Sequence, residues 1–400
     1  MIGAINAWAP DLYVDLHVTD GSDYQYDITW GYNGTYAHSP SIAGWLDRSL
    51  SPALARDLAA MGHVPGPLIF QIDNRDVMKG CAEGVTPPRL STGYGDARHL
   101  ASILVENHSL KSYDRRVLGT YVLLESVVRT AGADAAGLRD ATAADRARHP
   151  AEVTLSWKEP EGKSPDLRTF LGIESRLVLS AISGTMRVEY TGRPITAYVP
   201  FHVESEPAVT VSRPIAYWIP PVWHEAVERL ALHGIAFERI AEERALDAEV
   251  YRITDGKIDA APFEGRPQVT GTPVAERRRM TFAPGSVRVP TDQPLGDLAV
   301  LLLEPRSDDS LFRWGFFLES LQRTEYAEAY VLEPMAERML AADPALRAAF
   351  EKKLIDDPKF AGNADERLDF FYRRTPFYDD RWGIYPAARE VPGERVTKGS

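Results

Sequence analysis

The sequence predicts an α/β fold for its first third, followed by a β-rich or α+β accessory region and a mainly helical C-terminal region. Two short apolar runs in the first third end in polar residues, as buried strands of an α/β sheet do. From residue 151 onward, apolar and polar residues tend to alternate, which indicates strands with one solvated face. Past residue 295 the apolar residues recur at helical spacing. The expected parts of the chain are 1–132, 150–294 and 295–400.

The α/β region is expected to begin with a strand over residues 13–18. One acid and one histidine interrupt its apolar side chains, and an acid- and Gly-rich turn follows at 20–23. A helix is predicted over residues 52–61, with Ser51 as its N-cap and Pro52 in its first turn. The region therefore contains both strand and helix patterns, as an α/β fold requires.

The remainder of this region contains a loop, a strand and a helix in turn. Residues 65–88 are interrupted by Pro and Gly and should be mostly loop, of a length that usually shapes a pocket. A second buried strand ends at Glu106, and the helical spacing of apolar residues over 115–130 predicts a helix packed on the sheet. The Ala-, Asp- and Arg-rich stretch 131–150 is interpreted as helix plus linker at a domain boundary.

The accessory region should contain several strands and one amphipathic helix over residues 222–232. In the C-terminal region, Trp314, Phe316 and Phe317 form an aromatic cluster that we interpret as core packing rather than a ligand site. The Pro- and Tyr-rich end, 378–392, is expected to wrap the surface. Between the cluster and this end we expect three helices, at 327–342, 344–355 and 364–374.

Composition excludes several classes of function. With 400 residues, 44% of them hydrophobic and 26% charged, the chain can form two or three ordinary globular domains. Its 45 Lys and Arg against 57 Asp and Glu give a net charge of −12, which argues against binding nucleic acid or an anionic membrane. No apolar run approaches the ~20 residues of a membrane span. The one cysteine, Cys81, excludes an internal disulfide framework and has no evident base partner that would make it a nucleophile.

Polar side chains at the ends of the two predicted strands indicate a functional site. The first strand delivers His17 and the second delivers Glu106, followed by His108. Open α/β sheets place ligand sites at the carboxyl ends of their strands, and a carboxylate there is costly unless it is paired or functional. We therefore expect His17 and Glu106 at one edge of the sheet. Asp15 lies two positions before His17 on the same strand face, where it is placed to orient a neighbour through a hydrogen bond.

Two segments, DLHVTDGSDYQYD (15–27) and ILVENHSLK (103–111), with STGYG (91–95) between them, resemble the C-terminal half of a zinc carboxypeptidase catalytic domain. That family binds zinc through a His-x-x-Glu pair and a later His, and a strand-borne Glu acts as general base. The resemblance implies that His17 matches the later zinc ligand and Glu106 the general base. It covers roughly the first third of the chain, and the remainder resembles the C-terminal extension of a bacterial subgroup.

The family's His-x-x-Glu pair and its Asn-Arg clamp for the substrate carboxylate lie upstream of the segment matched here. We therefore expect an N-terminally truncated sequence with one zinc ligand of three, weak or no zinc binding, and no turnover by this chain alone. Export would require a signal peptide in such a missing segment, and without one the protein would be cytoplasmic. A His-x-x-Glu does occur at His149–Glu152, but Pro150 predicts a loop or helix start there, and we interpret it as a chance match.

The resemblance implies a peptide or amide substrate cleaved by metal-activated water. Asp15, His108 and Tyr94 are the expected substrate-side or supporting residues. Tyr94 is expected in a mobile Gly93-Tyr94-Gly95 loop, although it could equally be a packed aromatic. Three other interpretations stay open: a catalytically inactive peptide-binding module, a serine or cysteine hydrolase, and a purely structural protein. No GxSxG motif occurs, which argues against the commonest serine hydrolases. In the structural interpretation Glu106 would pair with a nearby cation such as Arg98, Lys111 or Arg115. The sequence gives no oligomeric state.

Overall fold

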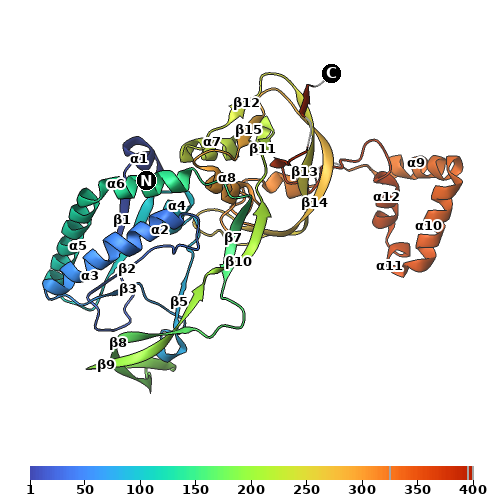
Figure 1. Cartoon of the computed structure of the whole chain (residues 1–400). Coiled ribbons are helices and arrows are strands. Elements are labelled where there is room, and N and C mark those ends of the chain that lie inside the picture. The colour runs from blue at the N-terminus through green and yellow to red at the C-terminus, as the bar shows by residue number, and fades with distance from the viewer. Residues whose placement is uncertain (324–325, 394–395, 399–400) are drawn as a thin grey trace.

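The computed structural model describes residues 1–323, 326–393 and 396–398, which form three parts in space (Figure 1). The N-terminal part is an α/β region, a larger β-rich region follows it, and a small helical bundle projects from the far end. The expectation of a mixed α/β protein is therefore confirmed. Within the described ranges, no helix combines the length and hydrophobicity that crossing a lipid bilayer requires.

A mixed four-stranded sheet lies at the centre of the α/β region. Its strands, in spatial order, are β1 (Leu12–Val18), β6 (Ala101–Asn107), β2 (Ile28–Gly31) and β3 (Pro65–Pro67). β1 runs parallel to β6, whereas β2 runs antiparallel to β6. Both strands predicted from apolar runs are therefore present, and they are neighbours. β1 is an edge strand, because among the described residues only β6 pairs with it.

Helices cover one face of this sheet. They are α2 (Pro40–Trp45), the π-turn η1 (Leu46–Leu50), α3 (Ser51–Ala60), α5 (Tyr113–Ala133) and α6 (Ala135–Arg146). Leu54 of α3 and Leu123 of α5 are fully buried in one core with Ile103 of β6. The helical spacing that predicted α3 and α5 thus reflects burial of one helix face against the sheet.

Ser51 is not the N-cap of a helix, contrary to the prediction. α2, η1 and α3 follow one another without a break, and the residue before Ser51 already has helical dihedral angles. The Ser51 hydroxyl instead accepts a hydrogen bond from Trp30 Nε1 on β2, at 3.1 Å. This serine therefore ties the helix to the sheet.

The segment between β2 and β6 is mostly irregular, as expected. It contains β3, the short strands β4 (Phe70–Gln71) and β5 (Cys81–Gly84), the 3-10 turn η2 (Val77–Lys79) and helix α4 (Ser91–Ala97). The expected loop at Gly93-Tyr94-Gly95 is wrong, because these residues lie inside α4. A Cβ on Gly93 would lie 2.2 Å from the backbone oxygens of Thr86 and Pro87. The glycine is therefore needed for close approach of two backbones.

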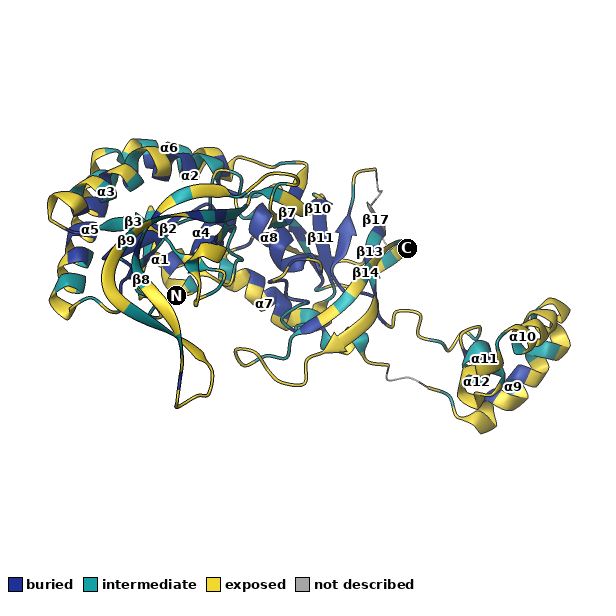
Figure 2. Ribbon diagram, turned by 90° about the horizontal axis from the view of Figure 1, so that it is seen from below, coloured by how far each residue is buried: buried dark blue, intermediate teal, exposed yellow. Residues whose placement is uncertain are grey.

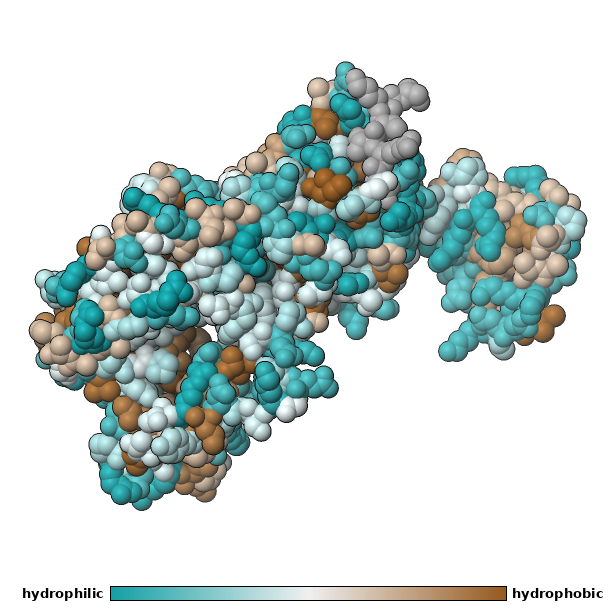
Figure 3. Space-filling model, in the orientation of Figure 1, coloured by the Kyte–Doolittle hydropathy of each residue, from teal (hydrophilic) through white to brown (hydrophobic). Residues whose placement is uncertain are grey.

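A long β-hairpin extends from the α/β region, at the lower end of the molecule in Figure 1. It consists of β8 (Asp166–Leu179) and β9 (Met186–Glu204), and β9 also pairs in parallel with β5. Several apolar side chains near its tip are exposed, among them Leu179 and Ile182. Figure 3 shows apolar surface on this hairpin.

The β-rich region is built around a larger sheet. Its strands, in spatial order, are β12 (Glu238–Arg239), β15 (Val287–Pro290), β11 (Ala216–Ile219), β16 (Ala388–Glu390), β13 (Arg244–Ile258) and β14 (Val269–Phe282), with β17 (Val396–Lys398) also pairing with β13. The other elements are β7 (Glu152–Lys158), β10 (Glu206–Ser212), η3 (Pro221–Trp223), α7 (His224–His233), α8 (Gly296–Leu303) and η4 (Leu318–Leu321). The buried α8 and β11 are dark blue in Figure 2.

The C-terminal stretch 378–392 does not wrap the surface as expected. It contains β16, which lies inside the larger sheet between β11 and β13. Tyr385 is buried in the core, and its hydroxyl donates to Leu303 O at 2.8 Å. Of the predicted aromatic cluster, Phe317 is buried and its ring contacts those of Tyr385 and Trp223, which confirms core packing for this residue.

The helical bundle comprises α9 (Ala329–Ala342), α10 (Pro344–Asp356), α11 (Pro358–Ala361) and α12 (Ala364–Tyr372). The three predicted helices are confirmed, with α11 as a short addition. Phe350, Phe360 and Phe371 form the core of the bundle. The two connections to the bundle leave the β-rich region at adjacent points, because Gly383 N–H donates to Ser320 O at 2.9 Å.

α5 has an exposed apolar stripe on the side away from the sheet. The stripe consists of Tyr113, Val117, Tyr121, Leu124 and Val128, and exposed turns of α5 are yellow in Figure 2. On the neighbouring edge strand β1, Leu16 and Val18 are also exposed. Exposed apolar surface of this extent is unusual for a monomeric protein.

Candidate functional site

His17 and Glu106 lie side by side at the carboxyl ends of two parallel strands. The pairing register of β1 and β6 places His17 directly opposite Glu106. Because residues in register on neighbouring strands project from the same face, both side chains lie on the same face of the sheet. The expectation that the two strand ends meet at one edge is therefore confirmed.

Asp15 lies on the same face and contacts His17. Asp15 Oδ1 is 3.0 Å from His17 Nε2, and half of the His17 side chain, 51%, is exposed. A carboxylate at this distance fixes the ring orientation and the proton position of an imidazole. The second ring nitrogen, Nδ1, therefore stays available for a ligand.

Glu106 is held in a partly desolvated environment. Its Oε2 atom is buried and has no hydrogen-bond partner among the described residues. Burial raises the pKa of Glu106; the nearby His17 lowers it, and Asp20 and Asp15 raise it further. A carboxyl group whose pKa is raised toward neutrality is suited to accepting and returning a proton.

A pocket of about 380 Å³ opens beside Glu106. Most of its polar walls come from the turn after β1 and from the segment containing β4. The lining residues include Asp20, Ser22, Tyr24, Gln71 and Asn74, together with the apolar side chain of Phe70. A pocket of this size admits a small ligand or the end of a larger one.

The described residues do not form a complete metal site. Among them, no group of three or more His, Cys, Asp or Glu side chains is arranged to hold a metal ion. His17 and Asp15 offer two donors at most. His149 and Glu152 lie exposed near the start of β7, and neither lines this pocket.

Neither Tyr94 nor His108 lines the pocket beside Glu106. Tyr94 is buried in α4, where its hydroxyl contacts His233 Nδ1 at 2.9 Å and accepts a hydrogen bond from Arg98 at 3.0 Å. His108 is fully buried, and Tyr24 N–H donates to its Nε2 at 3.2 Å. His108 therefore supports the turn that leads to the pocket wall, and neither residue lines the pocket.

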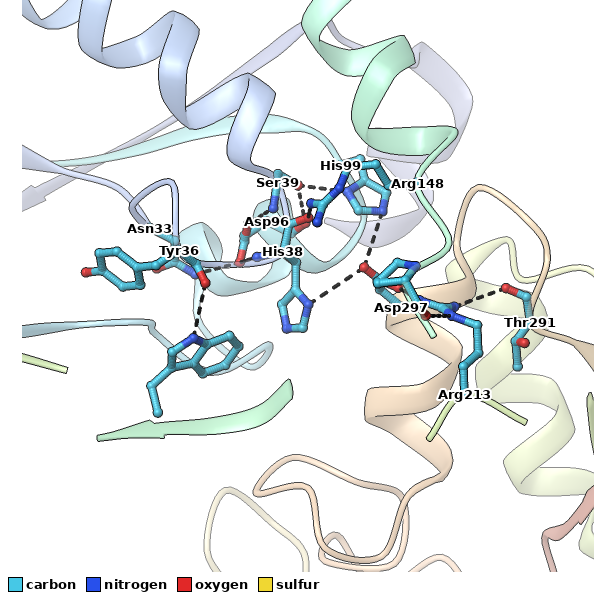
Figure 4. A network of polar contacts seen from close by, with 12 residues as sticks. Asn33, Tyr36, His38, Ser39, Asp96, His99, Arg148, Arg213, Thr291 and Asp297 are labelled. Atoms are coloured by element: carbon cyan, nitrogen blue, oxygen red, sulfur yellow. Dashed lines mark hydrogen bonds and ion pairs between the residues drawn. The ribbon is translucent and has the colours of Figure 1, made fainter. Parts of the chain in front are cut away.

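A second polar cluster was not predicted from the sequence. Figure 4 shows His38, Ser39, Asp96, His99 and Asp297 meeting between the α/β and β-rich regions. All five are buried, and Asp297 forms an ion pair with Arg213. One sequence signal could have pointed to it: Asp297 stands at the start of the otherwise apolar run GDLAVLLL, where a carboxylate requires buried partners.

Comparison with known proteins supports a relation to carboxypeptidases. The chain is 33% identical over 111 residues to carboxypeptidase 2 of Trichophyton rubrum, and 31% identical over 111 residues to that of Trichophyton tonsurans. It is 32% identical over 107 residues to a probable carboxypeptidase 2 of Arthroderma benhamiae. These matches take in 27 to 28% of this chain and 20 to 21% of the relatives, so the chain spans about a fifth of their length. No protein-family model and no solved structure matches.

Proposed function

We propose that this chain is part of a metallocarboxypeptidase-like hydrolase that acts on the carboxyl end of a peptide or on a related amide. The observation on which this rests most is the pairing of Glu106, with one buried and unpartnered oxygen, and His17 in register beside a polar pocket. The relatives named carboxypeptidase 2 support a peptidase. The finer assignment, a carboxypeptidase-like sheet with a zinc-dependent site, is part of the proposal.

Glu106 is the proposed general base. Its carboxylate takes a proton from the attacking water, and the resulting hydroxide adds to the scissile carbonyl carbon. Glu106 then returns the proton to the leaving nitrogen, the carbon–nitrogen bond breaks, and a carboxylic acid and an amine are released. The group ends in its starting protonation state, so the cycle is balanced.

His17 is the proposed metal ligand of this chain, with Asp15 as its orienting partner. Catalytic zinc normally has three protein ligands, and the described residues provide no such set. The residues present therefore do not fit a complete zinc site, and we derive no step of the reaction through zinc. We propose that further ligands come from polypeptide beyond this chain.

Peptide hydrolysis tests the proposal. The chain is assayed with N-blocked peptides, alone and joined to any coding sequence upstream in the same frame, with Glu106→Gln and a metal chelator as the two perturbations. Activity that both perturbations abolish, together with zinc that His17→Ala removes, supports the hydrolase. Activity that survives Glu106→Gln contradicts it.

The second candidate function is a catalytically inactive peptide-binding module. The incomplete set of metal donors favours it. In that case peptides bind at the pocket without being cleaved, chelators have no effect, and a substitution in the wall such as Gln71→Ala weakens binding. Measured turnover by either form of the protein rules this candidate out.

A further inference from the structure

A second cavity, of about 480 Å³, lies where the α/β and β-rich regions meet. Its walls include residues 85–89 with His38, strand β7, and the segment around α8 and residues 307–313. Glu204 of β9 and the connection between β13 and β14 also contribute. None of its lining residues lines the pocket beside Glu106. Cavities formed between domains are a common location for small-molecule sites, and this volume lies within their usual range.

His38 is held firmly in the wall of this cavity. The Asp96 carboxylate accepts hydrogen bonds from His38 N–H at 3.2 Å and from Ser39 N–H at 2.8 Å, which fixes the backbone. The His38 ring is held by Asp297 Oδ2, 3.7 Å from its Nδ1, and stands edge-on to Trp157. Figure 4 shows the contact between the His38 ring and Asp297.

The other ring nitrogen of His38, Nε2, has no hydrogen-bond partner among the described residues, although the side chain is only 8% exposed. Burial lowers the pKa of His38, but the contacts with Asp297 and Asp96 outweigh it and hold the pKa above its ordinary value. The ring therefore presents a polar, positively polarised N–H toward the cavity that it lines. A ligand in the cavity can accept a hydrogen bond from this N–H.

Arg313 adds a second cationic group to the wall. Its Nε donates to Gln268 Oε1 at 3.0 Å and its Nη1 donates to Val269 O at 3.4 Å, and both acceptors are neutral. A guanidinium fixed by neutral acceptors keeps its charge for an anionic group. His38 and Arg313 together favour a carboxylate inside the cavity.

Two exposed carboxylates in the cavity wall carry the charge opposite to that of His38 and Arg313. Asp308 and Glu204 both line the cavity and are exposed, and neither has an ion-pair partner within the described part of the chain. Trp157 and Phe263 also line the cavity, and their rings offer apolar contact. The lining thus combines exposed carboxylates, aromatic rings and cationic donors.

We propose that this cavity binds a free amino acid or a short unblocked peptide, with the carboxylate at His38 and Arg313 and the ammonium group at Asp308 or Glu204. A zwitterion fits the two charge signs, whereas a plain anion satisfies only one. The inference does not depend on the proposed hydrolase, because the two cavities are lined by different residues.

Calorimetric titration with alanyl-phenylalanine, its N-acetyl form and its C-terminal amide tests the proposal. The unblocked dipeptide should bind, and blocking either end should weaken binding at least tenfold. Equal affinity for the N-acetyl form means that only an anion is recognised and contradicts the zwitterion. Failure of all three to bind overturns the site.

Substitutions in the cavity wall test which side chains contact the dipeptide. Arg313→Gln and the double variant Asp308→Asn/Glu204→Gln should each weaken dipeptide binding at least fivefold, with Arg323→Gln, an arginine outside the cavity, as the matched control for Arg313→Gln. Circular dichroism and melting temperature show whether each variant folds. The double variant is decisive, because neither exposed carboxylate has an ion-pair partner in the described part of the chain. Unchanged affinity in the folded double variant contradicts the contact with the ammonium group.

Discussion

At the scale of single residues, Glu106 illustrates how a strand end determines acid–base chemistry. The neighbouring strands bury one carboxylate oxygen, and the shift in its pKa follows from that burial. Since the acid is more easily protonated in the folded state than in the unfolded chain, the ionised form is the destabilised one. The same property that makes Glu106 a suitable base therefore reduces folding stability at neutral pH.

Glu106→Gln should lower the rate of hydrolysis by about 10²- to 10⁴-fold, the usual contribution of a general base. It should also raise the melting temperature at pH 8. The folded state binds the Glu106 proton more tightly than the unfolded state, so its contribution to stability falls as pH rises from the unfolded pKa through the raised folded pKa. Melting curves at pH 4 and pH 8 measure this, and a larger gain at pH 4 contradicts it.

Asp297→Asn should destabilise the protein by about 3–5 kcal/mol, because it leaves Arg213 buried without its counter-ion. His38, Arg213 and His99 together lower the pKa of Asp297, although burial opposes them. Stability from this group is therefore fully present above the unfolded pKa of an aspartate and is lost as pH falls below it. Urea unfolding at pH 7 gives the difference. The exposed Asp308→Asn is the control, with a change expected within about 0.5 kcal/mol.

At the scale of elements, α5 presents two adjacent valines to opposite environments. Val127 is 5% exposed and faces the core, whereas Val128 is 73% exposed and belongs to the apolar stripe. The helix repeat of 3.6 residues places neighbours about 100° apart, which is enough to separate core from solvent. The chemistry of the two residues is identical, so burial alone distinguishes them.

Val127→Ala should cost about 1–3 kcal/mol, because it removes buried methyl groups and leaves a small cavity. Val128→Ala should change the free energy of unfolding by less than about 0.5 kcal/mol. Urea unfolding of the two alanine variants measures both changes. Equal destabilisation by the two alanine variants would contradict the placement of α5.

Elements supported by local patterns were predictable, and elements that depend on distant partners were not. The spacing of apolar residues in α5 and in the bundle is visible in any short window of sequence. β16 is different, because it pairs with residues 216–218, about 170 positions earlier, and nothing local marks it as a strand. α4 was not predicted, because glycines in a short window suggest a loop. In the structure Gly95 instead allows the Ser102 side chain to pack directly against the helix backbone.

In the candidate sites too, features with a local sequence signal could be predicted, and features that depend on distant segments could not. His17 and Glu106 could be paired from sequence because both strands carry their polar residues at the carboxyl end. The cluster around His38 could not be predicted, because its members come from three separate segments and meet only where two regions pack together.

At the scale of the whole molecule, the bundle is an insertion between η4 and β16 whose two connections start side by side. Trp382 Nε1 donates to Leu321 O at 3.1 Å, next to the bond between Gly383 and Ser320. Because the two ends of the bundle segment lie close together, the segment is attached to the β-rich region as a surface loop would be. Changes in the length of such a loop cost little folding free energy. The bundle also has its own aromatic core.

Replacing residues 322–382 by two glycines should therefore leave the melting temperature of the remaining protein within about 3 °C, a change of roughly 1 kcal/mol for a chain of this size. Differential scanning calorimetry of the shortened and full chains measures this. A shift of 10 °C or more would mean that the bundle stabilises the β-rich region.

The parallel pairing of β1 with β6 also determines when the N-terminal strand can fold. The last residue of β6, Asn107, follows Val18 by 89 positions (107 − 18), so β1 has no described partner strand until that length has been synthesised. At 5–20 residues per second, a ribosome needs about 4–18 s to add those residues. Throughout that interval the nascent segment LYVDLHV is unpaired and apolar, and it is the part of this chain that a ribosome-associated chaperone would be expected to protect.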